Sequence, residues 1–505
     1  MKKICLVLTL ILLCGLFVAS CDNSTGGGGS QNPADSPGPG ADLNNGSDDD
    51  ADDTGEPATE RIMPDVPDDR DFGGHEFIVL TNGTAYNSYW YSKDIYAEEE
   101  NGDAINDAVY ARNRVIEAKY NISIKDAPSG SQYNEARRSI TSGDNRFDMH
   151  TVPLQGAAAQ LAQEGLLMDL KEVPYIDLDK PWWDRRAYEQ LSIGNKLMFT
   201  VSDLLIMDKD SILAYLFNKD MVKEYALEDP YQLVRDGKWT IDKMWDMARS
   251  VTRDLNGDGV MDDSDQYGFI GQSHTMQGNI IGAGQALITK DENDLPMINV
   301  MHPLLIEAYA KWIEIFNDRN NTFVASDWER NHSDIWEYML NVQAEGRGLF
   351  QFTHMDRITL LRGYDFNFGI LPNTKLHESQ ERYHNAVNGY CSTSISIPIT
   401  ADPERTGIIL EAWTAESYYT LRSAYYEVSL KTKFLRDDES EEMLDLIFDS
   451  RVYDLGNFYN WGEVFGVLHG MVDARNTDYV SAYERIMPRI ERDMQRAIEM
   501  FLENT

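Results

Sequence analysis

The chain has 505 residues, of which 42% are hydrophobic and 26% charged, and its formal net charge is −39. This composition excludes collagen-like, coiled-coil and disulfide-scaffold proteins, and the length leaves room for two or more packed domains. An acidic surface repels phosphate backbones, and the sequence contains no basic patch that would reverse this repulsion. Nucleic acid is therefore excluded as a partner.

The N-terminus has the pattern of an export signal. Lys2 and Lys3 precede an apolar run over residues 4–17, which is too short to span a bilayer. Ala19 and Ser20 then precede Cys21, and this order resembles the bacterial lipobox. We expect a signal peptide over residues 1–20 and two acyl chains attached through Cys21, which would anchor the mature protein to the outer face of the cytoplasmic membrane. A plain secretory leader is the alternative.

Residues 21–71 are rich in Gly, Pro and Asp and almost lack large apolar side chains. Such a segment cannot offset the entropy of its ordering by burial, so it predicts a flexible acidic tether. Cation binding by the aspartates is the alternative. Because the other cysteines are in or at the end of the leader, Cys391 is the only thiol of the folded part, and no internal disulfide is expected.

Strand and helix patterns alternate from residue 72 onward. Segments 75–80, 121–124 and 147–152 are typical of strands, whereas 105–116 and 155–163 have helical spacing. A second block contains apolar runs at 197–201 and 212–217 and a helical pattern over 240–251. This alternation predicts an α/β fold with a parallel sheet.

Residues 254–265 (DLNGDGVMDDSD) match the twelve-residue calcium loop, in which oxygen ligands occupy fixed positions and glycine is at position 6. A strand pattern follows the loop, so a structural Ca²⁺ is expected rather than a sensor; a solvated acidic turn is the alternative. Asp265 replaces the usual glutamate at position 12, which weakens bidentate coordination. The predicted ligands are Asp254, Asn256, Asp258, the Val260 carbonyl, Asp262 and Asp265.

Catalytic motifs are absent from the sequence. It contains no G-x-S-x-G, H-E-x-x-H, G-x-x-x-x-G-K-[ST] or C-x-x-C segment, and its histidines are dispersed. Aromatic side chains do cluster, at 86–91, 182–183, 418–426 and 458–461. Aromatic rings beside polar side chains suit a sugar, because the ring covers the apolar C–H face while polar groups bind the hydroxyls. A non-enzymatic binding protein is expected.

Seven segments, in this order, resemble extracellular solute-binding proteins of family 1, the substrate-capturing lipoproteins of ABC importers for carbohydrates. They are 180–184 (KPWWD), 191–197 (LSIGNKL), 217–221 (FNKDM), 237–240 (GKWT), 265–269 (DQYGF), 368–372 (FGILP) and 457–462 (NFYNWG). The resemblance covers essentially all of residues 72–505. It implies a two-lobed periplasmic-binding-protein-like fold of type II with a central cleft between the lobes.

The resemblance also implies the domain organisation and the partners. Lobe 1 is expected at 72–208 plus 373–433, and lobe 2 at 209–372 plus 434–505. A sugar or oligosaccharide would bind between the lobes of a monomer, close them, and be delivered to the permease subunits. The residues expected to bind the ligand are Trp182, Trp183, Asp203, Tyr86, Trp90, His354, Tyr390 and Trp461.

Other functions stay open at this point. A surface-anchored glycoside hydrolase would use two of the many carboxylates. A binding protein for peptides or other solutes, or a sensor subunit that signals without transport, would share the same fold.

Overall fold

The computed structural model describes residues 61–87, 89–361, 364, 367–426 and 438–503. Residues 62–505 form one compact unit. The predicted signal peptide, Cys21 and most of the predicted tether lie outside the described residues. Within the described part, no helix is both long enough and apolar enough to cross a bilayer.

The first sheet has the strand order β12-β3-β1-β2. Its strands are β1 (His75–Asn82), β2 (Ile122–Ser129), β3 (Met149–Pro153) and β12 (Thr393–Ser396). β1 pairs in parallel with β2 and β3, and β12 is antiparallel to β3. The three strands predicted from the sequence are parallel as expected, but the fourth comes from a distant part of the chain and is antiparallel, so the sheet is mixed.

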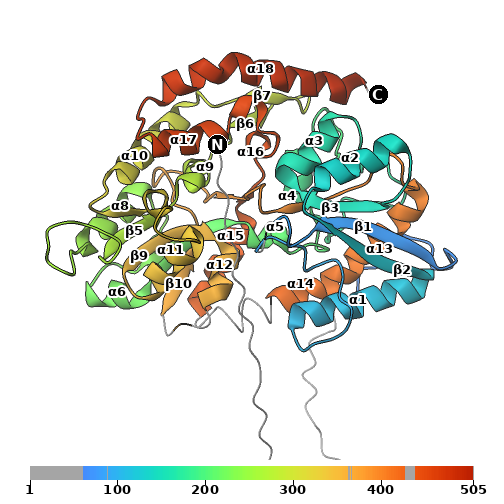
Figure 1. The fold of residues 1–505 in the computed structure, drawn as a ribbon, viewed down its shortest axis with the longest axis horizontal. Coiled ribbons are helices and arrows are strands. Elements are labelled where there is room, and N and C mark those ends of the chain that lie inside the picture. The colour runs from blue at the N-terminus through green and yellow to red at the C-terminus, as the bar shows by residue number, and fades with distance from the viewer. Residues whose placement is uncertain (1–60, 88, 362–363, 365–366, 427–437, 504–505) are drawn as a thin grey trace, which may run out of the picture. The chain divides into compact units, whose positions relative to one another are not determined.

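Helices cover this sheet on both faces. Figure 1 shows α1 (Ala104–Tyr120) along one side, and α2 (Gln132–Ser142) and α3 (Ala159–Gln163) along the other. The Asp103 carboxylate caps α1 by accepting from two backbone N–H groups, while Val109, Ile116 and Tyr120 form its buried stripe. α13 (Pro403–Tyr419) packs against α1, where the Trp413 Nε1–H donates to Asn113 Oδ1 at 2.9 Å.

The second sheet has the strand order β10-β4-β9-β5-β8. Its strands are β4 (Leu213–Asn218), β5 (Tyr267–Gly271), β8 (Thr322–Val324), β9 (Gly348–His354) and β10 (Phe368–Leu371). β5 is parallel to β8 and β9, whereas β4 is antiparallel to β9 and β10. All residues of β4 are buried, as expected of a strand covered on both faces.

Helices also cover the second sheet. In β8, Phe323 packs against Met339 and Val342 of α11 (Ile335–Ala344), whereas Val324 belongs to the main core. α8 (Ile241–Val251) begins where its sequence predicts, because Thr240 accepts from the Lys243 backbone N–H at 3.2 Å. The other helices around this sheet are α6 (Lys219–Glu224), α7 (Pro230–Arg235), α9 (Met276–Ile281), α10 (Pro303–Asn317) and α12 (Met355–Leu360).

The chain passes between the two sheets more than once: after β3 it enters the second sheet at β4, and after β10 it returns to the first at β12. The described residues also form two small two-stranded sheets. One pairs β11 (Asn385–Ala386) with β13 (Arg451–Val452), and the other is a hairpin of β6 (Ile288–Lys290) with β7 (Pro296–Ile298). The remaining helices are α4 (Arg185–Leu191), α5 (Met207–Asp210), α14 (Leu421–Ser423), α15 (Asp438–Asp449), α16 (Leu455–Tyr459), α17 (Gly466–Asp473) and α18 (Tyr479–Glu503). The lobe boundaries proposed from the resemblance stay a prediction.

The last residues of the predicted tether are described by the structure. Residues 62–71 belong to the compact unit and lie against its helices. The Ile62 N–H donates to the Tyr419 hydroxyl at 2.7 Å, Asp68 pairs with Lys119 at 2.6 Å, and Arg70 pairs with Glu404 at 2.5 Å. Polar contacts with α1 and α13 thus order a segment whose composition alone predicts disorder.

Candidate functional site

A cavity of about 410 Å³ is enclosed by segments that belong to both sheets. It lies beyond the carboxyl ends of β1 and β3 in the first sheet and of β5 and β9 in the second. Ligands of open α/β sheets bind at this end of the strands. We call it the cleft cavity; its lining residues are Asn87, Tyr89, Trp90, Gln155, His274, Thr275, Trp336, His354, Arg357, Asn388, Tyr390, Cys391 and Phe465.

Aromatic rings form much of the cleft cavity's wall. The Trp90 and Trp336 rings both pack near His354, with ring centroids 5.4 and 5.6 Å from the imidazole. Tyr390 is 46% exposed and packs on Tyr86 at 5.5 Å. Such a wall has flat apolar faces of the kind that a pyranose ring covers.

Polar side chains are interspersed with these rings. The Asn388 amide donates to His354 Nε2 at 2.9 Å, so the proton of the neutral imidazole is on Nδ1. Burial lowers the pKa of His354 to about 3, so the ring is neutral at physiological pH. Nδ1 has no hydrogen-bond partner among the described residues. His354 therefore has a spare donor for a ligand oxygen.

Arg357 contributes the one guanidinium of the lining. Its charged group lies over the Tyr89 ring at 4.4 Å, a cation–π contact that holds it in place. The Tyr89 hydroxyl in turn donates to Asp334 Oδ2 at 2.6 Å, and Asp334 caps α11. A chain of contacts thus fixes the arginine at the wall of the cleft cavity.

Three of the residues expected from the sequence, Trp90, His354 and Tyr390, line the cleft cavity. Tyr86 lies one layer behind, because its hydroxyl donates to the Tyr390 carbonyl at 3.3 Å. Burial raises the pKa of Tyr86, which keeps this hydroxyl protonated.

Trp182 and Trp183 do not line the cleft cavity. Both rings are buried, and both Nε1–H groups donate to the carboxylate of Glu411 on α13 at 2.9 Å. Both residues instead contribute to the lining of a separate, smaller cavity of about 190 Å³, and their expected contact with ligand stays a prediction.

Asp203 and Trp461 also lie elsewhere. Asp203 lines a separate cavity of about 190 Å³, where Lys209 Nζ is 3.7 Å from its Oδ1. The Trp461 ring stacks on Tyr459 at 4.6 Å, and its Nε1–H donates to Gln163. Their expected role in ligand binding has no support in this arrangement either.

The sequence reasoning missed several lining residues, among them Gln155, Trp336, Arg357, Asn388 and Phe465. One signal was available: His354 follows the apolar run at 349–350, and Arg357 comes about one helical turn after it. Trp336 belongs to a helix, and only the packing of α11 brings it to the cavity.

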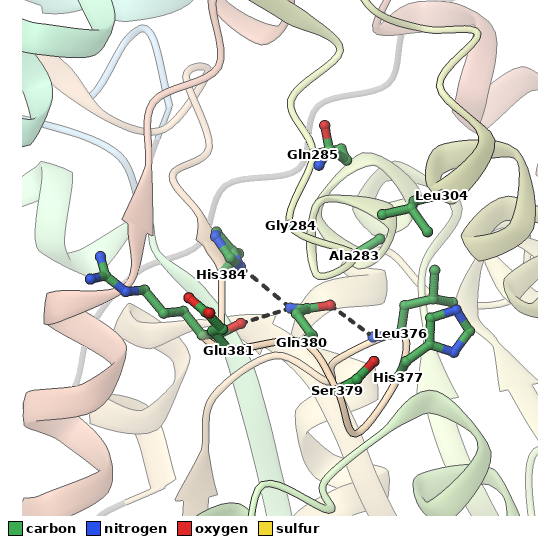
Figure 2. Close-up of a pocket in the computed structure, with 11 residues that line it drawn as sticks. Ala283, Gly284, Gln285, Leu304, Leu376, His377, Ser379, Gln380, Glu381 and His384 are labelled. Atoms are coloured by element: carbon green, nitrogen blue, oxygen red, sulfur yellow. Dashed lines mark hydrogen bonds between the residues drawn. The ribbon is translucent and has the colours of Figure 1, made fainter.

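A second cavity, of about 440 Å³, lies beside residues 376–384, α9 and α10 (Figure 2). The Gln380 amide at its centre donates to the carbonyls of Gly282 and Arg382 at 2.8 and 2.7 Å. Its Oε1 accepts from the Leu376 N–H at 3.2 Å. Because no Trp, Tyr or Phe is among its described lining residues and its central amide is already bonded, this cavity is less suited to a sugar.

The calcium-type loop keeps the turn that its sequence predicts. Gly259, at position 6, has φ +82°, and the Asp254 carboxylate accepts from the N–H groups of Gly257 and Gly259 at 2.6 and 2.7 Å. Asp265 is buried and accepts from the N–H groups of Leu255 and Asp262. Among the described residues, no group of three or more His, Cys, Asp or Glu side chains is arranged to hold a metal ion. Calcium binding stays a prediction.

No known family matches the chain in a family scan, and no curated protein matches it. Solved structures do. A substrate-binding protein of an ABC transporter from Listeria monocytogenes, solved with cycloalternan, has a TM-score of 0.54 at 11% identity over 83% of this chain and 99% of its own. The acarbose-binding GacH receptor of Streptomyces glaucescens has a TM-score of 0.53 at 13% identity, covering 84% and 98%.

A third neighbour differs in its ligand. UgpB from Mycobacterium tuberculosis, solved with glycerophosphocholine, has a TM-score of 0.54 at 13% identity, covering 84% of this chain and 99% of its own. These likenesses extend over nearly the whole of each neighbour. The chain therefore has the two-lobed α/β fold of ABC substrate-binding proteins.

Proposed function

We propose that this protein is a lipid-anchored, extracytoplasmic solute-binding protein that binds a sugar or oligosaccharide and delivers it to the permease of an ABC importer. The observation that carries the proposal is the cleft cavity. It combines aromatic walls with free hydrogen-bonding groups at the carboxyl ends of strands from two sheets. The ligands named for two of the structural neighbours, cycloalternan and acarbose, are saccharides.

Capture rather than hydrolysis is the better match to this cavity. Glycosidases place a pair of Asp or Glu side chains beside the scissile bond. The described lining of the cleft cavity includes neither residue type. A hydrolase is therefore the weaker candidate, and release of reducing sugar by the purified protein would restore it.

The test is a binding screen of the mature chain, residues 21–505, by thermal shift and then calorimetry. Mono- and oligosaccharides, amino acids and peptides form the panel, because a ligand that binds the folded state raises its melting temperature. Trp90→Ala should reduce the shift given by the best ligand, while Trp245→Ala, on the half-buried side of α8, should leave it unchanged. Shifts with peptides alone, or with no saccharide, would overturn the sugar assignment.

Calcium at residues 254–265 is a separate proposal, supported by the spacing of oxygen-bearing side chains and by the φ of Gly259. The ion would fasten the connection between α8 and β5. It has no part in ligand binding, because the loop contributes no residue to the cleft cavity.

A further inference from the structure

Arg357 has hydrogen-bonding capacity that the described part of the chain leaves unused. The residue is 3% exposed and lines the cleft cavity from the first turn of α12. Its Nε and Nη1 atoms are buried, and neither has a hydrogen-bond acceptor among the described residues. Buried donors without acceptors destabilise a folded protein, so such groups usually have a ligand or water as partner.

The neighbouring acid compensates the arginine only in part. Asp356 Oδ2 lies 3.4 Å from Arg357 Nε, which is close enough for an ion pair, although the geometry is not that of a hydrogen bond. Burial raises the pKa of Asp356 to about 7, so burial works against the ionised form of this carboxyl. The guanidinium itself stays protonated beside the cavity.

The charge of the cavity contrasts with that of the chain. The chain has a net charge of −39, yet the described lining of the cleft cavity contains Arg357 and no acid. A neutral sugar does not need a positively charged side chain in the cavity, because amides bind hydroxyl groups equally well. A negatively charged ligand does need a cationic side chain in the cavity, since the rest of the acidic surface repels such a ligand.

The chemistry of the guanidinium group narrows the class of ligand further. Its planar, forked N–H donors match the paired oxygens of a carboxylate or of a sulfate ester, and these charge-assisted bonds are about twice as strong as neutral ones. The Tyr89 ring covers one face of the Arg357 guanidinium at 4.4 Å. A ligand would therefore bind to the N–H donors along the edge of this group.

On the basis of the function proposed above, we propose that the saccharide bound in the cleft cavity carries an oxyanion, a carboxylate or a sulfate ester, and that Arg357 binds this group. The aromatic walls then cover the sugar ring while Arg357 selects for the charge.

The experiment uses two matched pairs of ligands with the mature chain in calorimetry. Oligogalacturonate is compared with its methyl ester, and a sulfated carrageenan disaccharide with its desulfated form; each pair differs in the oxyanion. We expect the charged member of one pair to bind at least about 10-fold more tightly than the neutral member. The responding pair distinguishes carboxylate from sulfate.

Two variants test the assignment to Arg357. Arg357→Gln should weaken binding of the charged ligand about 10- to 100-fold and leave the neutral member within about 2-fold. Arg249→Gln is the control, because Arg249 is exposed on α8 and pairs with Asp246. It should bind both members as the wild type does.

The outcomes separate this inference from the function on which it rests. If neutral saccharides bind at least as tightly as charged ones, the inference is overturned and saccharide capture stands. If no saccharide binds, both are overturned. The preference of the wild-type protein for the charged or the neutral ligand of each pair tests the inference even if Arg357→Gln does not fold. A preference that survives in a folded Arg357→Gln protein would refute the role of Arg357.

Discussion

Glu411 offers the sharpest test of the buried hydrogen bonds that hold Trp182 and Trp183. Its carboxylate, on α13, accepts from Trp182 Nε1 and Trp183 Nε1 at 2.9 Å and from the Asp177 N–H at 3.3 Å. The side chain is fully buried, and burial raises the pKa of the carboxyl from its usual 4.5 to about 7. The perturbation is Glu411→Gln, which keeps the size of the side chain and removes the titration.

The sign and size of the effect follow from this shift. The unfolded chain releases the Glu411 proton near pH 4.5, whereas the folded chain holds it up to about pH 7. The stability that this group contributes is thus fully present below pH 4.5 and is lost as the pH rises through about 7. At about 1.4 kcal/mol for each pH unit, the loss amounts to about 3 kcal/mol in the free energy of unfolding.

The assay is urea unfolding of the wild type and Glu411→Gln from pH 4.5 to 8. Other buried carboxyls titrate in both proteins and cancel in the difference between their free energies of unfolding. That difference should shift by about 3 kcal/mol in favour of the variant as the pH rises. Glu404→Gln, at an exposed position of the same helix, is the control and should change by less than about 1 kcal/mol. A flat difference for Glu411→Gln would refute the reasoning.

Three further changes test the site, the metal and the anchor. Trp90→Ala removes a ring at the wall of the cleft cavity and should weaken ligand binding at least about 10-fold in calorimetry, while Trp90→Phe, which keeps a ring, should lose less. Ca²⁺ at a hundredfold excess over its Kd should stabilise the fold by about 2.7 kcal/mol, seen as a higher melting temperature that Asp254→Ala abolishes. Cys21→Ser should move the protein from the membrane fraction to the medium in an immunoblot, because the acyl chains provide the anchor.

Each of these three has an outcome that contradicts it. Equal affinity for Trp90→Ala and the wild type would place the ligand elsewhere. A melting temperature that EDTA does not change would remove calcium from residues 254–265. Retention of Cys21→Ser in the membrane fraction would point to another anchor. Binding of the best ligand should be unchanged in Glu411→Gln, because Trp182 and Trp183 do not line the cleft cavity.

Local pattern was enough to predict the class of fold. The strands at 75–82, 122–129 and 149–153 and the helix at 104–120 follow from runs of apolar residues with recognisable periods. The cap at Thr240 and the left-handed glycine at position 259 also follow from sequence alone, since caps and tight turns depend on neighbours within a few residues.

The site depended on contacts between distant parts of the chain. A tryptophan is recognisable as a sugar-binding ring or as a core ring only once its neighbours are known. Trp182 and Trp183 are core rings because Glu411, more than two hundred residues away, accepts from both of their Nε1–H groups. Trp336 and Arg357 reach the cleft cavity because α11 and α12 pack against strands whose own partners come from elsewhere in the sequence.

The sequence by itself therefore determined the α/β class and the ends of strands near which the cleft cavity forms, and it predicts an export signal. Tertiary structure decided which side chains line that site, and it ordered residues 62–71 through ion pairs that composition does not reveal. The physical reason is the range of the interactions. Backbone propensity and apolar periodicity act over a few residues, whereas the burial of a ring or a charge is set by partners that only the folded chain brings together.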